Sequence, residues 1–93
     1  MEAKLNVNDG KGTLDLEENG IQTAYMKLIF KEDNKLFIEH TEVLPGNEGK
    51  GLGKILVKAA VDLARKNGWK ISSICPYAKS VLGKTDEFND VLV

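Results

Sequence analysis

The stretch "VLPGNEGKGLGKILVKAAVDLARKNGW", residues 43–69, decides how this chain folds. Glycine occupies every second position at Gly49, Gly51 and Gly53, directly before a run whose apolar residues recur with helical spacing. Glycine lowers helix stability by up to about 1 kcal/mol relative to alanine. Glycines just where a helix begins therefore indicate a backbone that must stay uncovered, as it does where a loop and a helix N-terminus bind an anion.

The run after the glycines predicts one amphipathic helix over residues 52–67. Asn67 and Gly68 supply the stop signal, and Arg65 and Lys66 in the last turn suit the negative end of the helix dipole. One helical face carries the apolar side chains of Leu52, Leu56, Ala59, Ala60, Leu63 and Ala64.

The residues before this stretch predict strands joined by tight turns. Asn19 and Gly20 form the strongest hairpin signal, because both positions tolerate positive φ, and Asp33 and Asn34 mark a further turn. Short turns of this kind join antiparallel neighbours. Alternating apolar residues and β-branched or aromatic side chains place the strands at residues 4–7, 13–18, 21–32 and 35–44.

A fifth strand is expected at residues 69–75, followed by a short helix at 76–83 that begins with Pro76. The tail from residue 86 is expected to add one more helical turn. Because a helix connects them, strands four and five are expected to be parallel. The sequence thus predicts an α+β fold of order β-β-β-β-α-β-α, with a mostly antiparallel five-stranded sheet, in a single domain spanning residues 1–93.

Composition narrows the functional classes. The chain has 93 residues, 42% of them hydrophobic and 29% charged, as in ordinary globular domains, and its net charge of −1 predicts neither nucleic acid nor a membrane as partner. The single cysteine, Cys75, and the absence of a signal-peptide pattern predict a cytoplasmic protein. One histidine and one cysteine are too few for a tetrahedral zinc site, so no metal is expected.

Two familiar phosphate motifs do not match the glycine loop. A P-loop would need glycine where Glu48 stands and serine or threonine where Ile55 stands. The dinucleotide fingerprint would need its third glycine at Lys54, and it would follow a parallel strand instead of hairpins. The remaining pattern is Gly-Lys-Gly-Leu-Gly, placed between a β-meander and a helix.

That pattern resembles motif A of the GNAT acetyltransferases, Gln/Arg-x-x-Gly-x-Gly/Ala, in which loop amides bind the pyrophosphate of acetyl-CoA. Gly51 and Gly53 match its two small positions, and Glu48 departs from its Gln/Arg position. The contexts "HTEV" at His40 and "CPY" at Cys75 extend the resemblance over nearly the whole chain, toward short single-domain acetyl-CoA-binding GNAT-like proteins. The resemblance implies a GNAT-like acyl-CoA N-acyltransferase fold.

The resemblance also implies a site. His40 and Cys75 would lie together beside the thioester, with His40 as base. Cys75 would either protonate the leaving CoA thiolate or itself take the acetyl group, and both routes stay open. Tyr77 lies near the usual position of a tyrosine acid. Acetyl-CoA or coenzyme A would bind at Val43, Leu44, Glu48, Gly49, Lys50, Gly51, Leu52, Gly53 and Lys54.

The function that follows is an acetyl-CoA-dependent N-acetyltransferase acting on an exposed amine: a protein lysine, a peptide N-terminus or a small amine. We expect a monomer or weak homodimer. A non-catalytic CoA- or acyl-CoA-binding module is the alternative, because Glu48 departs from the motif and no acceptor-pocket segments are evident. A protein-interaction domain that binds no CoA is a third hypothesis.

Overall fold

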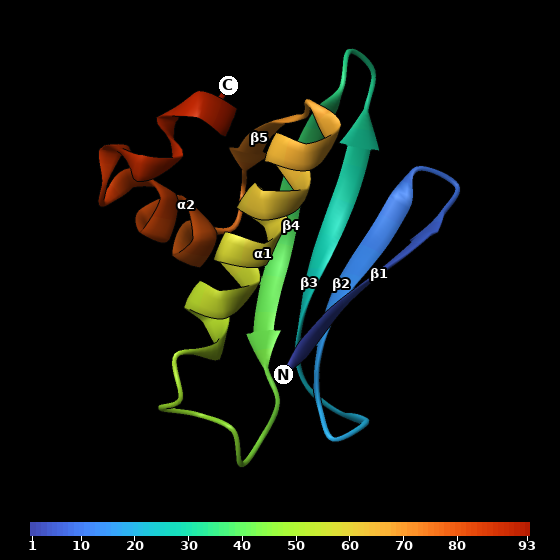
Figure 1. Ribbon diagram of the computed structural model, residues 1–93, viewed down its shortest axis with the longest axis vertical. Coiled ribbons are helices and arrows are strands. Elements are labelled where there is room, and N and C mark those ends of the chain that lie inside the picture. Colours follow the sequence, from blue (N-terminus) through green and yellow to red (C-terminus); the bar gives the residue numbers. More distant parts are fainter.

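The computed structural model describes all of residues 1–93 and shows a five-stranded sheet with α1 across one face (Figure 1). Helix α2 and the 3₁₀ helix η1 lie beside α1, near β5. In chain order the elements are β1 Glu2–Asn8, β2 Lys11–Glu18, β3 Ile21–Lys31, β4 Lys35–Val43, α1 Leu52–Asn67, β5 Lys70–Ser73, α2 Pro76–Gly83 and η1 Asp86–Val91.

The sheet runs β1-β2-β3-β4-β5, and its first three pairings are antiparallel. Strands β4 and β5 are parallel from the pair Lys35–Lys70 to the pair Ile38–Ser73. The element order and the parallel last pair confirm the predicted fold class. Since β4 continues to Val43, its final part has no partner on the side where β5 has ended.

A β-bulge interrupts β4 at Glu39. On one side of it Ile38 pairs with Leu28, and on the other side His40 pairs with Lys27, so Glu39 is the extra residue. A bulge of this kind changes the face that the following side chains reach, because alternation along a strand has a period of two.

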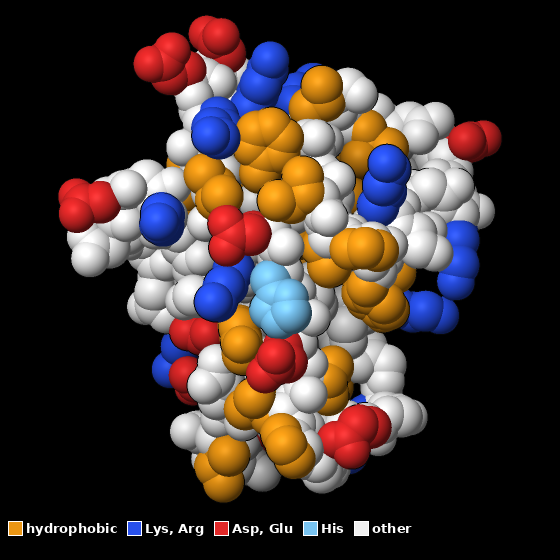
Figure 2. All heavy atoms as spheres, turned by 180° about the vertical axis from the view of Figure 1, so that it is seen from behind, with side chains coloured by type: hydrophobic (Ala, Val, Ile, Leu, Met, Phe, Trp, Pro, Cys, Tyr) orange, Lys and Arg blue, Asp and Glu red, His pale blue; other side chains and the backbone are white.

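The bulge decides which part of the "HTEV" sequence faces the helices. Before it, Leu36 and Ile38 are fully buried toward the core; after it, Thr41 and Val43 are half-buried on the same side. His40 therefore projects from the opposite, uncovered face of the sheet, which Figure 2 shows from behind with the single histidine at its surface.

The hydrophobic core lies between α1, α2, η1 and the inner face of the sheet. Of the side chains expected from the periodicity of α1, Leu52, Leu56, Ala60 and Ala64 are buried, whereas Ala59 and Leu63 are only partly buried at the edge of the core. Val57 and Val61 are buried in addition. Phe88 and Val91 of η1 are buried in the same cluster. The sheet contributes Leu14, Leu16, Ala24, Met26, Leu28, Leu36, Ile38 and Ile71.

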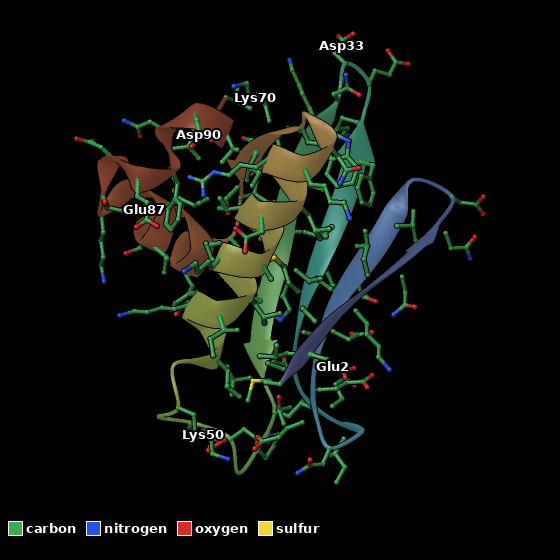
Figure 3. All side chains as sticks on the ribbon, in the orientation of Figure 1. Glu2, Asp33, Lys50, Lys70, Glu87 and Asp90 are labelled. Atoms are coloured by element: carbon green, nitrogen blue, oxygen red, sulfur yellow. The ribbon has the colours of Figure 1, made fainter.

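Polar contacts hold the C-terminal segment in place. The Arg65 guanidinium donates to both carboxylate oxygens of Asp90, at 2.9 and 3.0 Å, and to the Glu87 carbonyl at 2.7 Å. The Lys70 ammonium donates to the Asp90 carbonyl, and Figure 3 shows these two residues near each other. Arg65, which the sequence places on a polar helix face, thus joins α1 to η1.

The fifth strand is shorter than the expected residues 69–75, because it ends at Ser73. The Ser73 hydroxyl oxygen accepts the Cys75 N–H at 3.1 Å and the hydroxyl donates to the Cys75 carbonyl at 3.0 Å. Such a local side-chain contact competes with the sheet ladder. Cys75 therefore does not close the strand; it is the N-cap residue of α2. No helix in the protein has the length and apolarity needed to span a bilayer.

Replacing Leu56 by alanine tests where the core is centred. Leu56 is fully buried on α1, so Leu56→Ala removes packed methyl groups and leaves a cavity. We expect its free energy of unfolding, measured by urea denaturation, to fall by about 2–5 kcal/mol. The exposed Lys58 lies on the same helix, and Lys58→Ala should change the free energy of unfolding by less than about 0.5 kcal/mol. Equal effects for the two variants would contradict this description of the core.

Candidate functional site

A cleft of about 340 Å³ lies at the N-terminus of α1, bounded by the end of β4, the glycine loop and the start of α2. A larger hollow of about 510 Å³ lies over β1, β2 and β3, away from the glycine loop. The smaller cleft is lined by Thr41, Val43, Asn47, Gly49, Gly51, Leu52, Gly53 and Tyr77.

Free backbone N–H groups mark the floor of the cleft. Gly51 is the N-cap of α1 in the left-handed conformation, with φ 72°, and no side chain caps the helix. The first helical bond runs from the Ile55 N–H to the Gly51 carbonyl, so the N–H groups before Ile55 have no intrahelical acceptor. The first turn also contains no acidic residue. This helix end is therefore suited to a phosphate group.

Gly53 allows a close contact of a different kind. A Cβ atom at this position would lie 2.6 Å from the Tyr77 hydroxyl oxygen, with two ring carbons within 2.8 Å. Only a glycine lets the Tyr77 ring lie directly against the first turn of α1. The close approach places the Tyr77 hydroxyl in the cleft beside the helix N-terminus.

The unpaired edge of β4 forms one wall of the cleft. The Leu44 N–H donates to the Thr23 carbonyl of β3 at 2.9 Å, and the Leu44 carbonyl accepts the Asn47 N–H at 3.1 Å. Backbone groups alternate in direction along a strand, so those of Val43 point away from β3, to the side that β5 has left. Val43 can therefore pair with an extended ligand, whereas both backbone groups of Leu44 are engaged.

The charged residues of the loop lie outside the cleft lining. Lys50, Lys54 and Glu48 are exposed, and Lys50 lies on the loop that joins β4 to α1 (Figure 3). The Glu48 carboxylate accepts the Asn47 N–H at 3.2 Å. The Glu48 side chain is exposed and is not part of the cleft lining, and the two lysines add positive charge around the cleft.

His40 lies on the uncovered face of the sheet. Its Nε2 is 3.3 Å from Glu42 Oε1, and its side chain is 47% exposed. Its ring centroid is 6.1 Å from that of Tyr25. An exposed imidazole of this kind can act as a general base toward a substrate.

Cys75 lies on the other side of β4, and only 6% of it is exposed. Its Sγ is 3.8 Å from the Thr41 Oγ1. Burial acts to raise the pKa of the Cys75 thiol, but the backbone N–H groups of Ala78, Tyr77 and Thr41 and the Thr41 hydroxyl outweigh it and hold that pKa below its usual value. The start of α2 thus favours the thiolate.

The structure does not bring the side chains of His40 and Cys75 together. They flank the same unpaired part of β4 from opposite faces, and the partner of Cys75 is Thr41. Thr41 and Asn47 line the cleft, although no motif in the sequence indicates them. Thr41 stands next to His40 in the chain, so alternation signalled that only one of the two could face the helices. The bulge at Glu39 decides which one.

Comparison with known proteins places the chain in a family. The model of the GCN5-related N-acetyltransferases matches residues 13–91. A GCN5-like protein from Staphylococcus aureus, known from its solution structure, is 34% identical, with 97% of this chain and 87% of that chain covered and a TM-score of 0.69. A ribosomal-protein-alanine N-acetyltransferase from Brucella melitensis superposes with a TM-score of 0.68 at 16% identity, over 81% of this chain and 62% of that chain, and shares the fold.

A streptothricin acetyltransferase from Streptomyces lavendulae is 47% identical over 36 residues, which are 39% of this chain and 19% of that protein. The chain thus spans about a fifth of the length of that curated relative. With the family model covering most of the chain, the protein belongs to the GCN5-related N-acetyltransferase (GNAT) family, as the resemblance in its sequence predicts. Members of this family generally use acetyl-CoA as cosubstrate.

Gly53→Ala tests the contact that shapes the cleft. The new methyl group must displace the Tyr77 ring, so we expect it to stabilise the protein less than Gly83→Ala, where a Cβ meets nothing within 4 Å. Gly83→Ala should stabilise by up to about 1 kcal/mol through helix propensity. In a Tyr77→Ala background Gly53→Ala should recover a similar gain. Urea unfolding of the double-mutant cycle measures the coupling, and a coupling energy near zero would contradict the contact.

Proposed function

We propose that this protein is an acetyl-CoA-dependent N-acetyltransferase that binds its cosubstrate in the cleft at the N-terminus of α1. The observation that carries the proposal is the uncapped helix start at Gly51, with its free N–H groups opening beside the unpaired edge of β4. Family membership supports the same assignment.

The residues present fit coenzyme A in two respects. The N–H groups at the start of α1, together with Gly49 and Gly51, suit a pyrophosphate, because positive φ at these glycines turns the loop around the helix end. The free backbone groups of Val43 suit an amide-bearing arm that adds to the sheet edge as a further strand would. When bound, acetyl-CoA supplies an acetyl group activated as a thioester.

We assign the predicted binding residues different parts. Val43, Gly49, Gly51, Leu52 and Gly53 would contact the cosubstrate, since they line the cleft. The lysines beside the loop would attract its negative charge from solvent. Leu44 and Glu48 would act indirectly, by holding the turn that carries the loop through the Asn47 N–H. The lysines meant here are Lys50 and Lys54, and the contacts of Leu44 and Glu48 with the Asn47 N–H are the ones described above.

His40 is the proposed base. An amine attacks only when neutral, and a base that accepts its proton lowers the barrier. Cys75 would donate a proton to the leaving CoA sulfur from the inner side of β4. Because the two side chains lie on opposite faces, His40 is not placed to deprotonate Cys75. This separation favours direct transfer to the amine over transfer through an acetylated Cys75.

The proposed acceptor is an exposed amine: a protein lysine, a peptide N-terminus or a small amine. The names of the relatives cover both protein and small-molecule acceptors, since one acts on ribosomal-protein alanine and another on streptothricin. We propose that the protein acts in the cytoplasm, where its free Cys75 would stay reduced, as a monomer or weak homodimer.

A non-catalytic CoA-binding module is the competing function. The observation that favours it is the same separation of His40 from Cys75, because the expected paired site is not formed. Under this alternative, the cleft at Gly51 would bind coenzyme A with no further chemistry.

Thermal unfolding with acetyl-CoA, coenzyme A and ATP tests the binding site. Ligand at about 100 times its Kd should stabilise by about 2.7 kcal/mol, which raises Tm by roughly 10–20 °C in a domain of this size. Both CoA forms should act, and ATP should not. Gly51→Asp should abolish the increase by placing a carboxylate at the anion site. Gly20→Asp is the matched control, because Gly20 also has positive φ and nothing within 4 Å, and it should respond like wild type. An undiminished increase in Gly51→Asp would contradict the assignment.

His40→Ala and Cys75→Ala separate the enzyme from the binding module. If the protein is an enzyme, each variant should keep the acetyl-CoA-induced increase in Tm. Its kcat should fall about 10²- to 10⁴-fold, as for loss of a general acid or base. Release of free CoA thiol across a panel of peptides and polyamines measures turnover. A wild-type protein that binds acetyl-CoA and acetylates no amine would instead identify the module.

A further inference from the structure

Thr41 links a buried thiol to the cleft. Its side chain lines the cleft, whereas Cys75 is 6% exposed and is not part of the lining. The Thr41 Oγ1 is 3.8 Å from the Cys75 Sγ, and this is the one side-chain hydrogen bond that the thiol makes. The Cys75 thiol can therefore influence a ligand in the cleft only through Thr41.

We propose that Thr41 is a catalytic residue whose hydroxyl relays a proton from the Cys75 thiol to the sulfur that leaves acetyl-CoA. This relay rests on the proposed function and extends it to a residue that no sequence motif indicates.

The chemistry of the hydroxyl suits a relay. A threonine hydroxyl carries one donor and two acceptor sites, so it can accept from Cys75 Sγ–H while it donates to the leaving sulfur. An alcohol alone is too weak an acid for this step. The pKa of the Cys75 thiol is held below its usual value, so this thiol is at least as acidic as an ordinary leaving thiol and can give up its proton to the leaving sulfur without an energetic penalty.

The protons and bonds balance over one turnover. The amine nitrogen forms a bond to the acetyl carbon, and the carbon–sulfur bond breaks. Thr41 gives its hydroxyl proton to that sulfur and takes the proton of Cys75, which becomes a thiolate. The proton lost by the amine passes through His40 to solvent, and one proton from solvent restores the thiol.

The surroundings of the sulfur stabilise its thiolate without any charged partner. His40 and Glu42 of β4 face the other side of the sheet, and the ammonium groups of Lys58 on α1 and Lys79 on α2 are exposed. The hydroxyl of Tyr77 lies against Gly53, and only its backbone N–H acts on the sulfur. Thr41 is thus the one residue whose side chain is hydrogen-bonded to the Cys75 sulfur, and removal of its hydroxyl leaves the backbone donors in place.

Titration of the free protein tests the link. With one cysteine in the chain, the ¹³Cβ chemical shift of labelled cysteine reports Cys75 alone. Thr41→Val keeps the shape and removes the hydroxyl, so the midpoint should rise by about one pH unit, the effect of one lost hydrogen bond to a charged group. Thr41→Ser should restore the wild-type midpoint. Thr13→Val, at a half-buried threonine on β2, is the matched control and should leave it unchanged.

Turnover of the same variants tests the relay itself. Thr41→Val should lower kcat about 10²-fold and leave the KM for acetyl-CoA nearly unchanged, while Thr41→Ser keeps most of the activity. In a Cys75→Ala background Thr41→Val should cause little further loss, because the relay is already broken. An unmoved midpoint, an unaffected kcat, or losses that multiply in the double variant would each overturn the proposal. An inactive wild type would overturn the proposed function as well, which distinguishes the two failures.

Discussion

The rest of the structure depends on where the parallel pairing of β4 and β5 stops. It ends at Ile38 because the Ser73 hydroxyl binds the backbone of Cys75 and turns the chain into α2 at Pro76. The remaining part of β4, as far as Val43, has no strand partner on that side, and the backbone groups of Val43 stay free. One short turn thus creates both an open sheet edge and a second helix N-terminus next to it.

The N-termini of α1 and α2 both lie beside this open edge, and each offers its N–H groups to a different acceptor. At the start of α1, glycines leave the N–H groups open to a ligand, and no carboxylate in the first turn competes for them. At the start of α2, the N–H groups of Tyr77 and Ala78 act on the Cys75 sulfur. Both ends have unsatisfied donors and the positive end of a helix dipole, so one favours a phosphate and the other a thiolate.

Local signals account for the parts of the fold that the sequence predicts well. Positive φ is observed at Asn19, Asp33 and Asn34, where turn chemistry predicts it. The helix 52–67 agrees in both bounds, because apolar period and stop signal coincide there. Strand ends agree less well: β1 is longer and β5 shorter than expected, since edge pairing and the Ser73 turn depend on neighbours that no local pattern records.

The sequence by itself determined the element order, the hairpins, the helix and the position of the glycine loop, because each depends on residues close together in the chain. The tertiary structure alone decided which side chains meet. The bulge at Glu39 turns Thr41 toward the helices and His40 away from them, and the ring of Tyr77 occupies the space over Gly53. A bulge depends on the register between strands, and a close approach depends on packing between helices, so neither can be read from neighbouring residues.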